Sequence, residues 1–258
     1  MALLEVSGLK KVFKKNKKNY NAINNVNLLI EKGECLALVG ESGCGKSTTA
    51  NVIARLIKED AGTVTFDGNE ITKQRRLKPV GKDLQMIFQN PQDSFDPRDT
   101  VIEGVMQGAR SYGIFNNGEL KERALNMFEY VGLKKSYAYV KTSELSGGEC
   151  QRAAIARAII CEPKLLICDE ATSALDVLVQ AQIIDMLKRL KRDKQMAMLF
   201  ITHDLPLASA LCDKIAVMDH GEIVEEGKTR QVLKFPKHQQ TRNLIVSVRS
   251  VYDGTENF

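Results

Sequence analysis

The sequence predicts an α/β fold with a mainly parallel sheet, an antiparallel β edge and a helical insertion. Short apolar runs alternate with segments of helical periodicity in both halves of the chain, which is typical of parallel strands covered by helices on both faces. Alternating and apolar segments near the start favour two antiparallel strands. A middle stretch shows helical spacing alone, which indicates the insertion.

The first half supplies the antiparallel edge and the first buried strands. Residues 2–8 and 26–31 are the expected edge strands, with a lysine-rich loop between them. Further strands are expected at residues 35–39, 62–66 and 84–88. Helical spacing of Val52, Ile53 and Leu56 predicts a helix over residues 47–57.

The insertion runs from about Asn90 to Thr142, after which strand and helix alternate again. Strands are expected at residues 165–168, 198–201 and 215–218. An amphipathic helix is expected over residues 180–190, and the polar tail after Arg230 is also expected to be helical. The whole pattern fits one large α/β domain with a substantial insertion, which suits a chain of 258 residues.

The net charge of +5 comes from one short region near the start of the chain. Residues 1–20 contain six lysines and a single acid, Glu5, so the rest of the chain is neutral on balance. Such a local cluster is not a broad nucleic-acid-binding face, and nucleic acid is not expected as a partner. We interpret it as a solvated hairpin loop, with attraction to anionic headgroups or to a nucleotide as the alternative.

The six cysteines show no metal-binding or disulfide pattern. There is no CxxC pair and no histidine at metal-ligand spacing, so free thiols in a reducing compartment are expected. The start of the chain has no signal-peptide layout. No stretch reaches the roughly 18–20 apolar residues that span a bilayer, so the chain is not expected to cross a membrane by itself.

Residues Gly40–Ser47 match G-x-x-x-x-G-K-[ST], between an expected strand and an expected helix. Such a loop directs successive backbone N–H groups and a helix N-terminus toward the phosphates of a nucleoside triphosphate. Lys46 is expected to reach the β- and γ-phosphates and Ser47 to ligate Mg²⁺. Cys44 lies beside Lys46 and near a helix start, both of which lower a thiol pKa. We therefore expect Cys44 to be alkylation-sensitive and shielded by bound ATP, with an inert thiol as the alternative.

Polar residues follow three of the expected strands. Asp169 and Glu170 end an apolar strand, which is expected to bring them to the carboxyl edge of the sheet beside the phosphate loop. Asp169 is expected to hold Mg²⁺ and Glu170 to deprotonate the attacking water. His203 is expected to donate a hydrogen bond to the γ-phosphate. Gln89 is expected to touch Mg²⁺ or water and to couple the insertion to the nucleotide.

At Leu145-Ser-Gly-Gly-Glu-Cys-Gln-Arg152 the sequence resembles the signature of the ABC transporter ATPases, a family of P-loop NTPases. The resemblance covers nearly the whole chain, because Gly40–Ser47, Gln89, the signature, Asp169-Glu170, Ser173–Asp176 and His203 follow in the family's order. It implies an ATPase with the cofactors ATP and Mg²⁺.

The resemblance also implies a site shared between two chains. Ser146, Gly147 and Gly148, at the start of a helix over residues 151–160, would contact the γ-phosphate bound to a partner cassette, and Ser173–Asp176 would line the dimer interface. The family usually has glutamine where this chain has Glu149. That difference leaves open the contact of this position with ribose or water. Phe13 is the candidate for stacking on adenine, with Tyr20 as the alternative.

The implied site residues form three sets. Catalysis is assigned to Glu170, His203, Lys46 and Gln89. Nucleotide binding is assigned to Phe13, Gly40, Glu41, Ser42, Gly43, Cys44, Gly45, Lys46, Ser47, Thr48, Ser146, Gly147, Gly148 and Asp176. Metal binding is assigned to Ser47, Gln89 and Asp169.

The resemblance implies four parts of the chain. Residues 1–89 would form the N-terminal part of the ATP-binding core, with the antiparallel β subdomain and the P-loop, and residues 90–150 the helical signature subdomain. Residues 151–230 would complete the core, and residues 231–258 would form a C-terminal tail.

Two segments resemble the ATPases of peptide and nickel importers, Phe88–Arg98 and Pro236–Arg242. Such importers combine two cassettes, often different, with two transmembrane permease subunits and an extracytoplasmic solute-binding protein. The chain is therefore expected at the cytoplasmic face of the cell membrane as a peripheral subunit, with peptide or nickel as the cargo. An exporter cassette, and a soluble ABC protein acting on ribosomes or DNA, are the alternatives. The single cassette and the absence of heptads argue against the soluble class.

Overall fold

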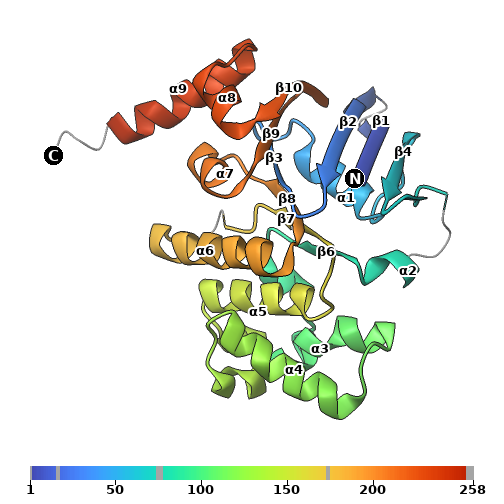
Figure 1. The fold of residues 1–258 in the computed structure, drawn as a ribbon, viewed down its shortest axis with the longest axis vertical. Helices are drawn as coiled ribbons and strands as arrows, with labels where there is room; N and C mark the ends of the chain where they lie inside the picture. The colour runs from blue at the N-terminus through green and yellow to red at the C-terminus, as the bar shows by residue number, and fades with distance from the viewer. Residues whose placement is uncertain (1, 16–17, 74–77, 173–174, 254–258) are drawn as a thin grey trace. The chain divides into compact units, whose positions relative to one another are not determined.

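The computed structural model describes residues 2–15, 18–73, 78–172 and 175–253. The chain divides into two compact units. One combines Met1–Arg75 with Ala197–Phe258, and the other is Arg76–Met196. We refer to them as the first and second units. Figure 1 shows both, with the elements labelled in chain order.

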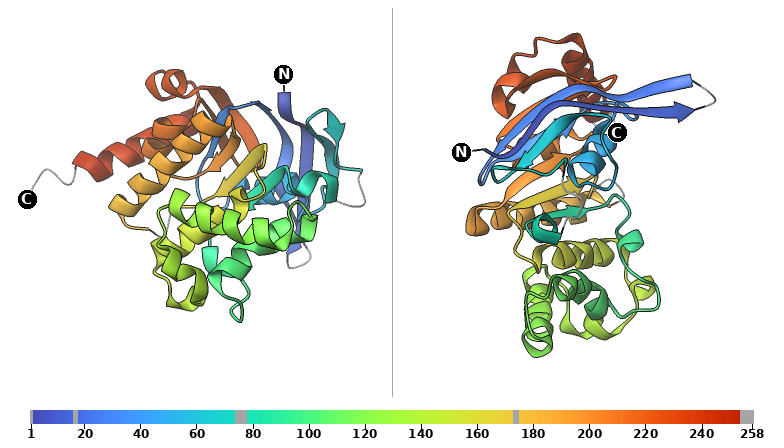
Figure 2. Two further views of the ribbon diagram at one scale, coloured as in Figure 1. Left: turned by 60° about the horizontal axis from the view of Figure 1, so that its bottom comes forward. Right: turned by 90° about the vertical axis from the view of Figure 1, so that its right-hand side faces the viewer.

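The first unit contains an antiparallel sheet with the strand order β2-β1-β4-β5. Its strands are β1 (Ala2–Lys15), β2 (Lys18–Glu31), β4 (Ala61–Phe66) and β5 (Asn69–Glu70). Figure 2 shows β1 and β2 running beside each other as a long ribbon. Their pairing continues to Lys15 opposite Lys18, so the lysines at positions 10, 11, 14, 15 and 18 belong to strands and not to the loop that we expected, while Lys17 lies outside the described residues. The backbone at these lysines pairs with the opposite strand, which extends the antiparallel ribbon into the expected loop.

A second group of strands in the first unit leads to the phosphate loop. The central strand β3 (Cys35–Val39) pairs in parallel with β8 (Ala197–Ile201) and β9 (Lys214–Asp219). Residues of β3 are all buried and apolar, as a central parallel strand requires. Strand β10 (Glu222–Lys228), which we did not expect, pairs antiparallel with β9.

Two residues with positive φ explain how β10 arises. His220 and Gly221 have φ angles of 44° and 85° and separate the paired residues Asp219 and Glu222. Positive φ at both central residues is the hairpin turn that matches the twist of antiparallel strands. A mainly polar strand such as β10 has no long apolar run, so only this turn marks it in the sequence.

The helices of the first unit are short until the tail. They are α1 (Lys46–Ile53), α7 (Leu205–Leu211), α8 (Thr229–Lys234) and α9 (Gln239–Asp253). The last two confirm the expected helical tail. Helix α1 ends four residues before Ile57, the end that we expected, because Arg55 has a φ of 60°, outside the helical region.

The second unit pairs two parallel strands, β6 (Leu84–Ile87) and β7 (Leu165–Asp169). Its longer helices are α3 (Val101–Tyr112), α4 (Asn117–Tyr130), α5 (Gly147–Ile159) and α6 (Val177–Lys194). Its short helical segments are α2 (Lys78–Gly81), η1 (Pro91–Ser94), η2 (Lys135–Tyr139) and η3 (Thr142–Glu144). Between β6 and β7 every described element is helical, as the periodicity predicted.

Helices α3, α4 and α5 pack side by side (Figure 1). They bury the apolar positions that predicted them, including Val105, Leu120 and Phe128. Capping boxes at Thr100 and Asn116 begin α3 and α4 and satisfy backbone groups that a helix leaves open at its start. Within the described ranges, no helix combines the length and the apolar character needed to cross a membrane.

Candidate functional site

The phosphate loop connects β3 to α1 in the first unit, as the motif predicted. A Cβ atom on Gly45 would lie 2.2 Å from the carbonyl oxygen of Ala22, and one on Gly40 would lie 2.2 Å from that of Met218. No side chain fits at that separation, and Gly45 also has a φ of 113°. Neighbouring backbone from β2 and β9 therefore dictates glycine at both positions.

Lys46 is folded back over the loop. Its Nζ donates hydrogen bonds to the carbonyl oxygens of Gly40 and Glu41, both at 2.8 Å, and the residue is only 4% exposed. Gly45, the N-cap of α1, has no side chain to cap the first N–H groups of the helix. A buried ammonium beside an uncapped helix start is a site for an anion such as a phosphate.

Other residues fix the outer surface of the loop. The Tyr20 hydroxyl donates to the carbonyl oxygen of Gly43 at 3.0 Å, and the N–H of Gly221 donates to that of Cys44 at 2.9 Å. Glu41, Ser42 and Gly43 are exposed. The contribution of Gly221 escaped sequence reasoning, because nothing in the local pattern connects residue 221 to the loop.

Cys44 does not have the environment that we expected. Its side chain is buried, and desolvation by that burial raises the pKa of the thiol. The nearby Lys46 ammonium lowers the pKa, but this effect is smaller than that of burial. The expectation of a lowered thiol pKa was therefore wrong, while alkylation of Cys44 and its shielding by ATP stay a prediction, with an inert thiol as the alternative.

The two candidate aromatic residues lie directly opposite each other. Phe13 on β1 pairs with Tyr20 on β2, and their exposed fractions are 38% and 52%. The Lys11 ammonium lies 5.5 Å from the centre of the Phe13 ring, and Tyr20 is tied to the phosphate loop. An exposed ring at either position is available to stack on a base, so the assignment to Phe13 stays a prediction.

His203 also belongs to the first unit. It follows β8 through Thr202, and its side chain is exposed. Asp204 accepts a hydrogen bond from the N–H of Leu207 at 3.0 Å and so caps α7. The Asp204 N–H in turn donates to the Thr202 hydroxyl at 3.0 Å. These two bonds fix the backbone on either side of His203.

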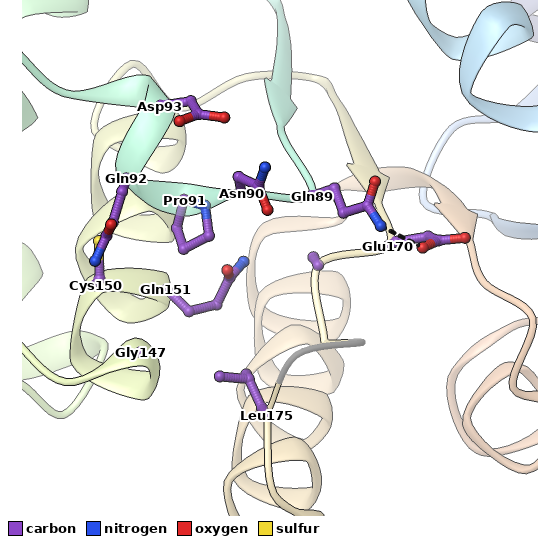
Figure 3. A pocket seen from close by; sticks show the side chains of 11 residues that line it. Gln89, Asn90, Pro91, Gln92, Asp93, Gly147, Cys150, Gln151, Glu170 and Leu175 are labelled. Atoms are coloured by element: carbon purple, nitrogen blue, oxygen red, sulfur yellow. Dashed lines mark hydrogen bonds between the residues drawn. The ribbon is translucent and has the colours of Figure 1, made fainter.

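Gln89 and Glu170 lie together in the second unit. The Gln89 Nε2 donates to Oε2 of Glu170 at 2.8 Å, which Figure 3 shows as a dashed line. Glu170 has a φ of 46°, an uncommon conformation for a residue with a side chain. Asp169, one residue earlier at the end of β7, is buried. The sequence predicted all three residues at strand ends, and the structure brings Gln89 and Glu170 into contact.

A cavity of about 270 Å³ lies beside this pair, within the second unit. It is lined mainly by η1, the start of α5, and Glu170, Ala171 and Leu175 (Figure 3). Gln151 reaches into it from α5 and is almost fully buried. Within the described part of the chain, its Nε2 has no hydrogen-bond partner. Because buried donors are normally hydrogen-bonded, we expect an ordered water to accept from this Nε2, and the cavity is large enough to hold one. The sequence placed Gln151 within the signature but gave no signal that its side chain would line a buried cavity.

The signature residues form the start of α5. Ser146 is the N-cap, so the helix begins at Gly147 and not at Gln151 as we expected. The Glu149 Oε2 accepts hydrogen bonds from the Ser146 hydroxyl at 2.7 Å and from the Ser146 N–H at 2.9 Å. The first of these bonds is the largest cause of a lowered Glu149 pKa. A helix that begins inside the signature supports the expected anion site at Ser146, Gly147 and Gly148.

Asp176 is the N-cap of α6 and accepts a hydrogen bond from the N–H of Val179 at 3.0 Å. The next two side chains, Val177 and Leu178, are 82% and 70% exposed. Two adjacent exposed aliphatic residues are typical of a contact surface. Ser173, the other end of the expected interface segment, lies outside the described residues.

Comparison with known proteins connects this geometry to a family. Residues 23–173 match the family model of the ABC transporter, which includes the phosphate loop, Gln89, the signature and Glu170. This chain belongs to the ABC transporter family. The prediction from the signature motif is thereby confirmed.

Two curated ATP-binding proteins of the family are similar over most of this chain. The oligopeptide transport ATP-binding protein of Escherichia coli K12 is 41% identical over 247 residues, covering 95% of this chain and 74% of its own length. The glutathione import ATP-binding protein of Salmonella typhimurium LT2 is 40% identical over 239 residues, covering 92% of this chain. This chain spans only 38% of the length of that relative.

Solved structures confirm the predicted fold class. A dimeric post-hydrolysis state of the ATP-binding cassette MJ0796, bound to ADP and Pi, superposes with a TM-score of 0.81 at 31% identity. The match covers 88% of this chain and 99% of that one. The cassette cbiO1 from Clostridium perfringens, part of an ABC transporter complex, gives a TM-score of 0.80 at 25% identity, with 99% of both chains covered.

Proposed function

We propose that this chain is the ATP-hydrolysing subunit of an ABC importer. The observation that carries the proposal is the phosphate loop, in which Lys46 is buried and held over two loop carbonyls at the uncapped start of α1. The arrangement combines a positive charge with oriented N–H groups, which is the combination that binds the phosphates of a nucleoside triphosphate. Family membership and the similarity to an ADP-bound cassette support this assignment.

The proposed metal ligands are Ser47, Gln89 and Asp169. Their hydroxyl, amide and carboxylate oxygens form the hard donor set that Mg²⁺ prefers. Gln89 uses its Nε2 to bind Glu170, which leaves Oε1 as the metal-binding atom. Bound Mg²⁺ would neutralise charge on the β- and γ-phosphates. Within the chain itself, Lys46 would exchange its bonds to loop carbonyls for bonds to phosphate oxygens.

Glu170 is the proposed general base for the attacking water. The hydrogen bond from Gln89 holds the Glu170 carboxylate in place through Oε2, and a carboxylate held in this way can accept a proton from water. The uncommon φ of Glu170 sets the direction of the side chain after β7. His203 would hold the γ-phosphate by donating a hydrogen bond, and Phe13 would stack on the adenine.

We further propose that ATP is held between two cassettes. Ser146, Gly147 and Gly148 would bind the γ-phosphate at a partner's phosphate loop, with Asp176, Val177 and Leu178 in the contact surface. The exposed aliphatic pair and the dimeric state of the MJ0796 cassette support this arrangement. The importer would also contain two transmembrane permeases and a solute-binding protein, and this chain would lie at the cytoplasmic face of the membrane. The partner cassette would be either a second copy of this chain or, as we favour, a different cassette.

The proposed cargo is a short peptide. Support comes from the printed names of the two relatives, one an oligopeptide transporter component and the other a glutathione importer component. Nickel is the alternative cargo. Deleting the gene should abolish uptake of a labelled tripeptide and leave nickel uptake unchanged, and the reverse result would identify the metal as the cargo.

Replacing Glu170 with Gln tests the enzymatic role. Glu170→Gln keeps the size of the side chain and removes the base, so we expect ATP hydrolysis to fall by about 10²–10⁴-fold while ATP binding persists. Binding is measured with a fluorescent ATP analogue and turnover by phosphate release. Glu122→Gln, at an exposed position of α4, is the matched control and should retain full activity. Turnover of Glu170→Gln near that of the control would exclude Glu170 as the base.

A further inference from the structure

Two thiols in the first unit lie in contact. The Sγ atoms of Cys35 and Cys212 are 3.0 Å apart, and both residues are buried. Cys35 begins β3, and Cys212 is the C-cap of α7, so 177 positions of sequence separate them. A disulfide requires a sulfur separation of about 2.0 Å, so an approach of about 1 Å would complete the bond.

Backbone hydrogen bonds hold the two cysteines in this position. The Asp213 N–H donates to the carbonyl oxygen of Cys35 at 2.9 Å, and the Cys35 N–H donates to Oδ2 of Asp213 at 2.8 Å. The Thr229 hydroxyl donates to the carbonyl oxygen of Cys212 at 2.9 Å. The backbone of both cysteines is therefore held by hydrogen bonds. Such fixed proximity favours an intramolecular bond over reaction with another molecule.

We propose that Cys35 and Cys212 are a site of reversible oxidation, forming a disulfide when a hydroperoxide is present. The thiolate of Cys212 attacks the peroxide, the O–O bond breaks, and a sulfenic acid and an alcohol or water form. The Cys35 thiol then attacks the sulfenic sulfur, forms the S–S bond and releases water. Two thiols lose two electrons, and one peroxide gains them. Exchange with two small thiols reverses the reaction, because they reduce the Cys35–Cys212 bond and leave as a small disulfide.

The bond would join two elements next to the candidate site. Strand β3 leads directly into the phosphate loop at Gly40, and α7 follows His203 by two positions. A disulfide here would close a loop of 177 positions. A cross-link that closes a long loop lowers the conformational entropy of the unfolded chain more than one that closes a short loop. We therefore expect oxidation to raise the stability of the folded chain. This proposal is independent of the proposed transport function.

Thiol counting on the full-length protein tests the proposal. Purified protein is treated with hydrogen peroxide, the peroxide is removed, and the free thiols are titrated in denaturant. A parallel sample is blocked with an alkylating reagent and digested without reduction for mass spectrometry. We expect the six thiols to fall to four, with one cross-linked peptide joining Cys35 to Cys212. Dithiothreitol should restore all six thiols. Six thiols after oxidation, or a cross-link between other cysteines, would overturn the proposal.

Variants connect the bond to stability. The denaturation midpoint of the wild type should rise on oxidation and return on reduction, and Cys35→Ser and Cys212→Ser should show no such rise. Cys161→Ser, a buried cysteine in the second unit, is the matched control and should behave as the wild type. A rise that persists in Cys35→Ser or Cys212→Ser would contradict the assignment. Peptide mapping of the wild type decides the question even if one variant fails to fold.

Discussion

At the residue scale, the Ser146 side chain has one role in folding, through its hydrogen bond with Glu149, and a second role in the proposed binding of phosphate. Glu149 accepts two hydrogen bonds from Ser146, and its charge lies at the positive end of α5. In the isolated chain the Ser146 hydroxyl is therefore directed at a carboxylate. If Ser146 binds the γ-phosphate of a partner's ATP, its hydroxyl has to give up the hydrogen bond to Glu149 and donate to a phosphate oxygen instead. Glu149, at the position where the family usually has glutamine, thus stabilises the start of α5. It also competes with the phosphate for the hydroxyl of Ser146.

Removing the charge of Glu149 should destabilise the protein in a pH-dependent way. The folded pKa of Glu149 is lowered, so its contribution is complete above the ordinary value of 4.5 and is lost as the pH falls through the folded pKa. Glu149→Gln should lower the free energy of unfolding at neutral pH by about 0.3–1 kcal/mol. Urea denaturation at neutral pH and at about pH 4 should show this difference narrowing. If wild type and Glu149→Gln differ in unfolding free energy by the same amount at both pH values, the charge of Glu149 does not cause the difference. Glu122→Gln serves as the control.

At the element scale, helix starts decide much of the second unit. Helices α3, α4 and α5 each begin with a capping box, and α6 begins with Asp176 as its cap. Each cap satisfies an N–H group that the first turn leaves without a partner inside the helix. These polar residues therefore fix where each helix begins, while the apolar stripe fixes which face is buried.

Truncating one cap tests this account. The Asn116 Oδ1 accepts the N–H of Glu119 at 3.0 Å at the start of α4, so Asn116→Ala should cost about 1 kcal/mol of unfolding free energy. Asn117→Ala, one residue inside the same exposed turn, removes no cap and should change stability by less than about 0.5 kcal/mol. Chemical denaturation of both variants measures the difference. Equal effects would show that the Asn116 cap contributes nothing specific.

The elements that sequence reasoning predicted are those with a local cause. The apolar run 35–39, the glycines of the phosphate loop and the periodicity of α4 each dictate their own structure. Strand β10 was missed because its only apolar residues are Ile223 and Val224, too short a run to predict a strand, and because its pairing with β9 depends on a turn. The burial of Cys44 was also missed, because it depends on how the loop packs and not on neighbours in sequence.

Among the site residues, the same distinction holds. Strand ends predicted Gln89 and Glu170, which form a hydrogen bond. The role of Gly221 is long-range, since its N–H donates to the carbonyl oxygen of Cys44 in the phosphate loop. Gln151 likewise shares its cavity with residues distant in sequence, such as Gln89 and Glu170. Packing of this kind has no periodic signal in a single sequence.

At the scale of the whole molecule, the proposed catalytic residues are divided between the two compact units. The phosphate loop and His203 belong to the first unit, and Gln89, Glu170 and the signature belong to the second. Because the signature is proposed to act on a partner's nucleotide, one chain would supply two half-sites and complete neither alone. ATPase activity should therefore depend on association of two cassettes.

Mixing two inactive variants tests this arrangement. Lys46→Ala removes the phosphate-binding ammonium, and Ser146→Ala removes a signature contact, so each variant alone should hydrolyse ATP poorly. In a mixed dimer, the phosphate loop of the Ser146→Ala chain meets the intact signature of the Lys46→Ala chain and forms one complete site. Random pairing makes about half of the dimers mixed, so an equal mixture should recover about a quarter of the activity of a wild-type homodimer.

The wild-type chain at the same total concentration provides the reference for this experiment. Double-variant chains carrying both Lys46→Ala and Ser146→Ala should gain nothing when mixed with Lys46→Ala chains, because no complete site can form. Recovery that rises with protein concentration would connect activity to association of two copies. If the wild type is active and the mixture is not, then a signature from a second copy does not complete the site, and the proposal of a shared site fails for this chain.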